Sequence, residues 1–211
     1  PEIDVPLMEQ SSASLHDVME RRISGRDYGS QILSLADLSH FLYRVARTKQ
    51  VQSQGGPEVQ SRPYPSGGSL HELEFYVAVR QCEGLMPGLY HYQGLNHLLR
   101  HLPNSEAAAQ RMHTLSATCM GQPDLPPDAL IVVSSRHPRI AMKYEGISYR
   151  TSLLNAGVAI QTMYLVATDM GLQGCATGIG DSRIFEAVTG LDRFEETTIT
   201  EFALSAPAKS D

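Results

Sequence analysis

Lysine is scarce in this 211-residue chain, occurring only at positions 49, 143 and 209. Acidic residues outnumber basic ones by 23 to 17, which gives a formal net charge of -6. The chain therefore lacks the basic surface that nucleic-acid-binding proteins use. It also has no apolar run long enough to cross a bilayer and no charged-then-apolar opening typical of a signal peptide. We expect neither a nucleic-acid partner nor a membrane partner.

The cysteines are few, and they exclude further classes. Cys82, Cys119 and Cys175 are odd in number and widely spaced, which argues against a disulfide framework and provides no metal-ligand pair. We expect reduced thiols in a cytoplasmic protein, and no metal site. A G-x-G-x-x-G fingerprint after a strand is also lacking, because the glycine-rich stretch at 174–181 follows a predicted helix. This pattern argues against a dinucleotide-binding fold.

Hydrophobic periodicity predicts one domain, residues 14–211, preceded by an extended lead at 1–13. Residues 48–69 are rich in Gly, Ser, Gln and Pro and are predicted to form a loop. The order of elements indicates an α+β fold, with a mixed or antiparallel central sheet flanked by helices. We expect helices at 15–22, 35–47, 105–120, 149–170 and 182–190, strands at 72–80, 128–136 and 197–205, and a hairpin at 87–102. The helix at 149–170 is apolar on most faces, so we expect it in the core.

Residues 20–29, ERRISGRDYG, concentrate arginines around a serine. Arg22, Ser24 and Arg26 alternate, so an extended backbone would place all three on one side. The planar guanidinium group suits phosphate oxygens, and the serine adds a hydroxyl donor. The alternative is a solvated basic turn, since cations are also favoured at the C-terminal end of a helix.

Two further segments have the small residues that a flat ligand requires. Residues 65–69, PSGGS, form a predicted tight turn into a strand, where glycine permits close approach to the backbone. Residues 171–182, GLQGCATGIGDS, would likewise leave room and expose backbone N–H groups. The alternatives are an ordinary loop-to-strand turn for the first segment, and a helix end followed by a helix start for the second.

Five motifs in this order resemble the FMN-dependent nitroreductase fold, and within it the SagB-type or McbC-like azoline dehydrogenases. They are R-x-S-x-R-x-[FY] at 22–28, Y-P-S-x-G at 64–68 followed by a strand, G-[LV]-Y-x-Y at 88–92, K-Y with a following Y-R at 143–150, and G-L-x-x-C-A-x-G at 171–178. The resemblance implies an enzyme that oxidises thiazoline and oxazoline rings in peptide natural products. Related oxidase domains occur within non-ribosomal peptide synthetases.

The resemblance also implies roles for individual residues. Arg22 and Ser24, with Ile23 between them, match the positions that hold the FMN phosphate, and Arg26 matches a cationic position near the pyrimidine edge. Other matched positions are Pro65, Ser66, Gly67 and Ser69 in the turn at the flavin edge, Gly178 and Ile179 against flavin N5, and Lys143 and Tyr144 as the catalytic pair. Many relatives close the phosphate site with a basic C-terminal pair, whereas this chain has only Lys209 there. We therefore expect Arg150 to contribute to the phosphate site.

Converting an azoline to an azole removes two electrons and two protons, as a hydride to flavin N5 and a proton to a base. Free tyrosine has a pKa of about 10 and free lysine a pKa of about 10.4, so neither is a good base alone near neutral pH. A neighbouring cation favours tyrosinate, and burial favours neutral lysine. The Lys143–Tyr144 pair could thus accept the proton. The alternative is an exposed Lys-Tyr pair with no catalytic role.

The resemblance further implies a homodimer, with the helix at 149–170 in its interface. The substrate would be an azoline-containing peptide or a chain bound to a carrier protein. One alternative is NAD(P)H-dependent reduction of quinones or nitro compounds on the same fold. Another is a flavin-free scaffold subunit of a peptide-modifying complex.

Overall fold

The computed structural model describes residues 2–4, 13–28, 31–53, 58–178 and 180–207. Seven of the described strands form one sheet in the order β1-β6-β5-β4-β7-β9-β8, in which every neighbouring pair is antiparallel. The strands are β1 Glu2–Asp4, β4 Leu73–Val79, β5 Gly88–Gln93, β6 Leu98–His101, β7 Ala129–Arg136, β8 Gln173–Thr177 and β9 Glu196–Ser205. The predicted α+β fold with an antiparallel sheet is confirmed.

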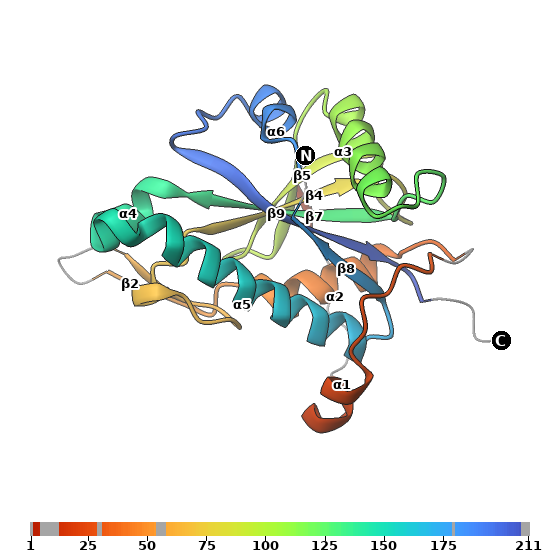
Figure 1. Ribbon diagram of the computed structural model, residues 1–211, viewed down its shortest axis with the longest axis horizontal. Coiled ribbons are helices and arrows are strands. Elements are labelled where there is room, and N and C mark those ends of the chain that lie inside the picture. The colour runs from red at the N-terminus through yellow and green to blue at the C-terminus, as the bar shows by residue number, and fades with distance from the viewer. Residues whose placement is uncertain (1, 5–12, 29–30, 54–57, 179, 208–211) are drawn as a thin grey trace.

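Helices cover both faces of this sheet (Figure 1): α2 and α5 lie on one face, and α3 and α6 on the other. The alternation of β4 explains the two layers, because successive side chains point to opposite faces of a sheet. Phe75 and Val77 pack with α2 and α5, whereas Tyr76 and Ala78 pack toward α3 and α6. The helices are α1 Leu15–Arg21, α2 Leu35–Ala46, α3 Glu106–Cys119, α4 His137–Tyr144, α5 Ser148–Asp169 and α6 Ser182–Thr189.

Side-chain caps begin the first two helices where the sequence predicts them. The Ser14 hydroxyl accepts a hydrogen bond from the Asp17 N–H at the start of α1. The Ser34 hydroxyl does the same for the Asp37 N–H at the start of α2, at 3.0 Å. Each cap satisfies an N–H group that has no partner within its helix.

Several elements were not predicted. The predicted loop at 48–69 contains a short antiparallel pair, β2 Gln50–Gln52 with β3 Val59–Ser61. The helix α4 carries a proline in its first turn, which suits a helix start. Strand β8 follows α5 where we expected only a helix end. Its residues are too small and too few to show alternation, so only its pairing with β9 reveals it.

The helix α5 is correctly predicted in extent, but its burial is not as expected. It buries one face, including Ala156, Ala159 and Met163, against the sheet. Leu154 on the opposite side is 61% exposed, so the expectation that α5 lies wholly in the core is wrong. Across the described ranges, no helix combines the length and apolarity that a bilayer-spanning segment requires.

Candidate functional site

The arginine-rich segment lies along the C-terminal half of α5 and strand β8. The Gly25 N–H donates to the Gly174 carbonyl oxygen at 2.9 Å. The Ser24 hydroxyl lies 3.1 Å from the Tyr164 hydroxyl, and the Arg22 guanidinium carbon lies 5.3 Å from the centre of the Tyr164 ring. Two of the three predicted segments, 20–29 and 171–182, are therefore brought together.

Tyr164 connects this segment to the sheet. Its hydroxyl oxygen accepts a hydrogen bond from the Ala176 N–H at 2.9 Å. Strand β8 is the last strand of the sheet among the described residues, so this N–H belongs to an edge on which no described strand pairs. One tyrosine hydroxyl thus joins Ser24, α5 and the free edge of β8.

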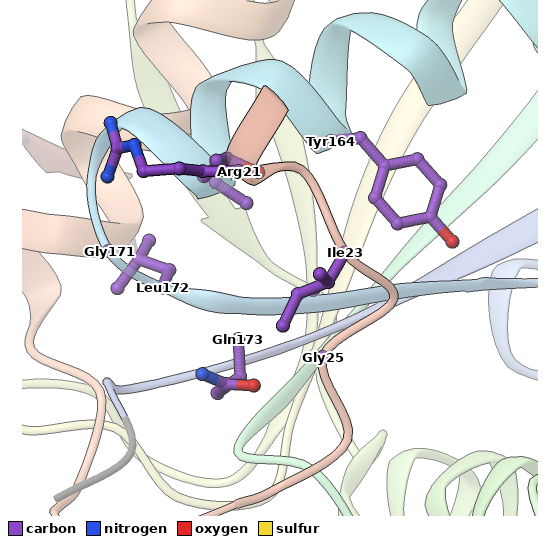
Figure 2. Close-up of a pocket in the computed structure, with 10 residues that line it drawn as sticks. Arg21, Ile23, Gly25, Tyr164, Gly171, Leu172 and Gln173 are labelled. Atoms are coloured by element: carbon purple, nitrogen blue, oxygen red, sulfur yellow. The ribbon is translucent and has the colours of Figure 1, made fainter. Parts of the chain in front are cut away.

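A pocket of about 140 Å³ lies between residues 21–25, the end of α5 and the start of β8. Figure 2 shows Ile23, Tyr164 and Gln173 around it, with the backbone of Gly25 passing between them. A Cβ at Gly25 would collide with the Gln173 side chain in its present conformation, which shows how closely the two segments pack. From this segment the pocket lining takes Arg21, Ile23 and Gly25, whereas Arg22 and Ser24, which alternate with them along the chain, do not line the pocket.

The charges beside this pocket suit an anion. Arg22 is half-buried and Arg26 is exposed, and neither has an acidic partner within hydrogen-bonding range in the described part of the chain. Beyond the far end of β8, a Cβ at Gly178 would meet no atom within 4 Å. Ile179 lies outside the described residues. The edge of β8 therefore has arginines near its first residues, and beyond its last residue it has Gly178, which has open space around it.

The predicted turn at 65–69 lies elsewhere, against Lys143 and Tyr144. A Cβ at Gly68 would lie 2.6 Å from the Lys143 Nζ atom, and one at Gly67 would lie 3.2 Å from the Tyr144 ring. The pair occupies the end of α4, with the Lys143 Nζ 6.0 Å from the centre of the Tyr144 ring. Absence of side chains at 67 and 68 allows this contact.

The Ser66 hydroxyl is hydrogen-bonded within the protein. The hydroxyl donates to Glu72 Oε2 at 3.2 Å and accepts from the His71 N–H and from Asn155 Nδ2. A hydroxyl group has one donor position and two acceptor positions, and these three hydrogen bonds occupy all of them. Any cofactor contact at this turn would involve the exposed Pro65 and Ser69 or the backbone.

The two clusters lie on opposite flanks of α5. Tyr164 contacts the arginine cluster, by which we mean Arg22, Ser24 and Arg26, through Arg22 and Ser24. Asn155 contacts the turn, where its Oδ1 accepts a hydrogen bond from the Gly67 N–H at 3.1 Å. The nine positions between them are about two and a half helical turns, which places the two side chains on opposite sides. Arg150 is at the N-terminal end of α5, about 21 Å from Tyr164 at 1.5 Å per residue. The chain therefore does not bring Arg150 to its own Arg22 and Ser24.

A buried acid lies behind the glycine loop that follows β8. Glu201 on β9 is 4% exposed, and its Oε2 atom has no hydrogen-bond partner in the described structure. Burial raises the pKa of this carboxyl to about 7. The cavity beside it, about 110 Å³, is lined by Gly178, Gly180 and Thr198 among others.

Four residues at these sites were missed from the sequence: Glu72, Asn155, Tyr164 and Glu201. Tyr164 and Asn155 interrupt the apolar pattern of a mainly apolar helix, and Glu201 directly precedes the apolar run Phe202–Leu204. A polar residue at a position that should be buried was the available signal, because such residues need partners.

The residues present fit FMN. A phosphate group requires cations and hydroxyl donors without competing acids, and Arg22 and Ser24 supply them. A planar ring requires a backbone free of side chains, and Gly178 provides it. These features lie along one edge, that of β8.

A family model described as the Nitroreductase family matches residues 19–200. Three curated proteins are similar in sequence. The Methanocaldococcus jannaschii protein MJ1384, which carries a provisional nitroreductase name, is 29% identical over 84% of this chain and 83% of its own. Trifolitoxin-processing protein TfxB of Rhizobium leguminosarum bv. trifolii is 27% identical over 77% of this chain. Microcin B17-processing protein McbC of Escherichia coli is 24% identical over 81% of this chain. The chain spans only 44% of TfxB and 64% of McbC.

Solved structures share the fold. A Ralstonia eutropha JMP134 protein has a TM-score of 0.75 at 22% identity, covering 99% of this chain and 90% of its own. The E. coli microcin synthetase McbBCD complex with truncated pro-MccB17 bound contains a chain with a TM-score of 0.69 at 22% identity, covering 97% and 76%. A Desulfovibrio desulfuricans protein in complex with FMN has a TM-score of 0.58 at 16% identity, covering 95% and 92%.

Proposed function

Because this chain belongs to the nitroreductase family, we propose that it is an FMN-dependent azoline dehydrogenase of the McbC-like, SagB-type group. Its substrate would be a thiazoline or oxazoline ring in a peptide, and its product the aromatic azole. The observation that carries the proposal is the placement of Lys143 and Tyr144 against the Gly67–Gly68 backbone. The similarity to two proteins named for processing trifolitoxin and microcin B17 supports the same substrate class.

The chemistry that FMN supplies when bound is acceptance of a hydride. Arg22 and Ser24 would hold its phosphate, Arg26 would balance negative charge on its pyrimidine edge, and the backbone at Gly178 would face its ring. Aromatising an azoline then leaves one proton to be removed from the ring. We assign that proton to the Lys143 amine or the Tyr144 hydroxyl, because Lys143 is exposed and Tyr144 is half-buried, which leaves both within reach of a ring carried on a peptide.

The proposal also includes a homodimer. Exposed apolar side chains lie on the outer side of α5, between the two flanks: Leu153, Leu154 and Val158. Pairing of two copies through this side would let the arginine cluster of one copy and the Lys143–Tyr144 pair of the other share a site. Light scattering coupled to size exclusion should give the mass of a dimer for the wild type and of a monomer for Leu154→Glu. A monomeric wild type would contradict this arrangement.

The test is conversion of an azoline-bearing peptide by the purified protein after FMN has been added, in air, so that molecular oxygen can reoxidise the reduced flavin. The expected product is lighter by two hydrogens, and the sample should show visible flavin absorbance. Lys143→Ala and Tyr144→Phe should each slow the conversion by about 10²- to 10⁴-fold, the usual contribution of a general base. Both variants should still bind FMN, because the arginine cluster lies on the other flank of α5.

Lys49→Ala and Tyr149→Phe are matched controls, since both side chains are exposed and neither contacts the turn. Normal conversion by both Lys143→Ala and Tyr144→Phe would remove the pair from the mechanism.

A second function, NAD(P)H-dependent reduction of nitro compounds or quinones, is favoured by the similarity to MJ1384 along most of both chains. Rapid bleaching of the flavin by NADPH under nitrogen would support it. Failure of NADPH to bleach the flavin, together with azole formation, would support the dehydrogenase.

A further inference from the structure

The turn beside the catalytic pair is held in an unfavourable backbone conformation. Gly68 has a φ of 59°, and the two non-glycine residues Ser69 and His71 have φ values of 57° and 48°. Side chains are disfavoured in this left-handed region, so such residues persist only when their surroundings hold them. The turn therefore needs an external restraint to keep its shape.

Asn155 of α5 supplies that restraint through all of its polar atoms. Its Oδ1 accepts from the Gly67 N–H at 3.1 Å. Its Nδ2 donates to Ser66 Oγ at 3.2 Å and to Glu72 Oε1 at 2.9 Å. The Asn155 amide thus forms hydrogen bonds with two successive residues of the turn, Ser66 and Gly67, and with Glu72, which directly precedes β4.

Glu72 completes the restraint from the interior. Its residue is fully buried, and its carboxylate oxygens accept from Asn155 and from the Ser66 hydroxyl. No basic side chain pairs with it in the described ranges. A buried carboxylate with only neutral donors is costly to maintain for stability alone, because its desolvation is not offset by an opposite charge. This cost suggests a positional role.

The outer side of the same turn contacts the catalytic pair. The Gly67 backbone lies against the Tyr144 ring and Thr151, and the Gly68 backbone lies against Lys143 Nζ. We propose that Asn155 and Glu72 are positioning residues, which lock the turn at 66–69 and thereby fix the place of Lys143 and Tyr144. The catalytic consequence rests on the proposed function, but the positional effect on Lys143 does not.

The amide at position 155 and the carboxylate at position 72 can be exchanged by mutation. Asn155→Asp alone would place two carboxylates face to face, and Glu72→Gln alone would place two amides together. The double variant Asn155→Asp/Glu72→Gln restores an amide-to-carboxylate hydrogen bond with the roles reversed. The introduced carboxylate can still accept from the Gly67 N–H. Asn155→Ala removes the amide without adding a charge, and Thr162→Ala is the matched control on α5, since its hydroxyl donates to the Val158 carbonyl and to no other group in the described ranges.

The readout is acylation of Lys143 by limiting acetic anhydride, measured by peptide mass spectrometry relative to the exposed Lys49 of the same chain. Releasing the turn should free the Lys143 amine from its contact with the Gly68 backbone and raise the Lys143-to-Lys49 ratio by about threefold or more, in the range of couplings between neighbouring residues. The ratio should rise in Asn155→Ala, Asn155→Asp and Glu72→Gln. It should return to the wild-type value in the double variant, and it should stay at that value in Thr162→Ala. Azole formation should follow the same order, with kcat affected more than KM.

An unchanged ratio in all single variants, measured on folded protein, would overturn the proposal, as would a double variant that behaves like the sum of its singles. If the ratios follow the expected order while the wild type forms no azole, the positioning role stands and the proposed function fails.

Discussion

Replacing Glu201 with glutamine should stabilise the protein at neutral pH. The folded-state pKa of about 7, against an ordinary value of 4.5, is caused by burial alone. The folded protein therefore binds more protons than the unfolded chain between pH 4.5 and about 7, and stability falls as the pH rises through this window. At about 1.4 kcal/mol per pH unit, the cost that Glu201 imposes at the top of the window is ~3 kcal/mol. Glutamine has the shape of the protonated acid and carries no such cost.

The assay is urea unfolding of the wild type and of Glu201→Gln at several pH values across the same window. The two proteins should have similar stability at its acidic end, and the variant should gain progressively, up to ~3 kcal/mol, toward pH 7. Other groups titrate here too. Burial lowers the pKa of His71 and of His113 to about 4, so their contribution to stability rises with pH. The difference between the two proteins cancels this opposing effect.

A matched control is Glu20→Gln, the same change at an exposed position on α1. It should leave the pH dependence unchanged. Stability curves of the wild type and of Glu201→Gln that stay parallel across the window would refute the reasoning, because they would mean that Glu201 ionises alike in the folded and unfolded chains.

Three further predictions concern the sheet edge and the core. Gly174→Ala should destabilise the fold by about 1–3 kcal/mol in thermal unfolding, since its Cβ would lie 2.6 Å from Phe202 Cζ; an unchanged midpoint would show that the ring moves freely. Tyr164→Phe removes the hydroxyl that joins Ser24 to Ala176, and should weaken FMN binding in a fluorescence titration by about tenfold, the effect of one lost hydrogen bond; an equal Kd would separate Tyr164 from the cofactor site. Phe41→Ala should cost about 3–5 kcal/mol in urea unfolding, because this fully buried ring stacks on Phe202 at 6.1 Å; a loss below 1 kcal/mol would show that the core refills the space.

Local patterns predicted most of the elements. The serine caps of α1 and α2, the alternation in β4 and the continuous apolar run of β7 depend on residues within a few positions of one another. The elements that were missed lack such a signal: β8 has five small or polar residues, and β2 has only three residues, two of them glutamines. The pairing of β8 with β9 and of β2 with β3, and not their own residues, makes them strands.

The predicted site residues lie in two separate clusters within one chain. The sequence correctly indicated a cationic segment and a second glycine-rich segment that meet, and the structure joins them at Gly25 and Gly174. It also indicated a glycine turn, but the inward direction of the Ser66 hydroxyl depends on Glu72 and Asn155. Sequence spacing does not reveal which polar residues support a site when those residues are far from it along the chain.

The sequence by itself determined the class of fold, the positions of the caps and the residue types suited to a phosphate and to proton transfer, because these follow from short-range periodicity and side-chain chemistry. Only the tertiary structure decided that Ser24 meets Tyr164 across 140 positions and that Gly67 meets Asn155 across 88. Those contacts place the two clusters on opposite flanks of α5. The physical reason is that packing against the sheet chooses which face of that helix is buried, and thereby which side chains emerge on each flank.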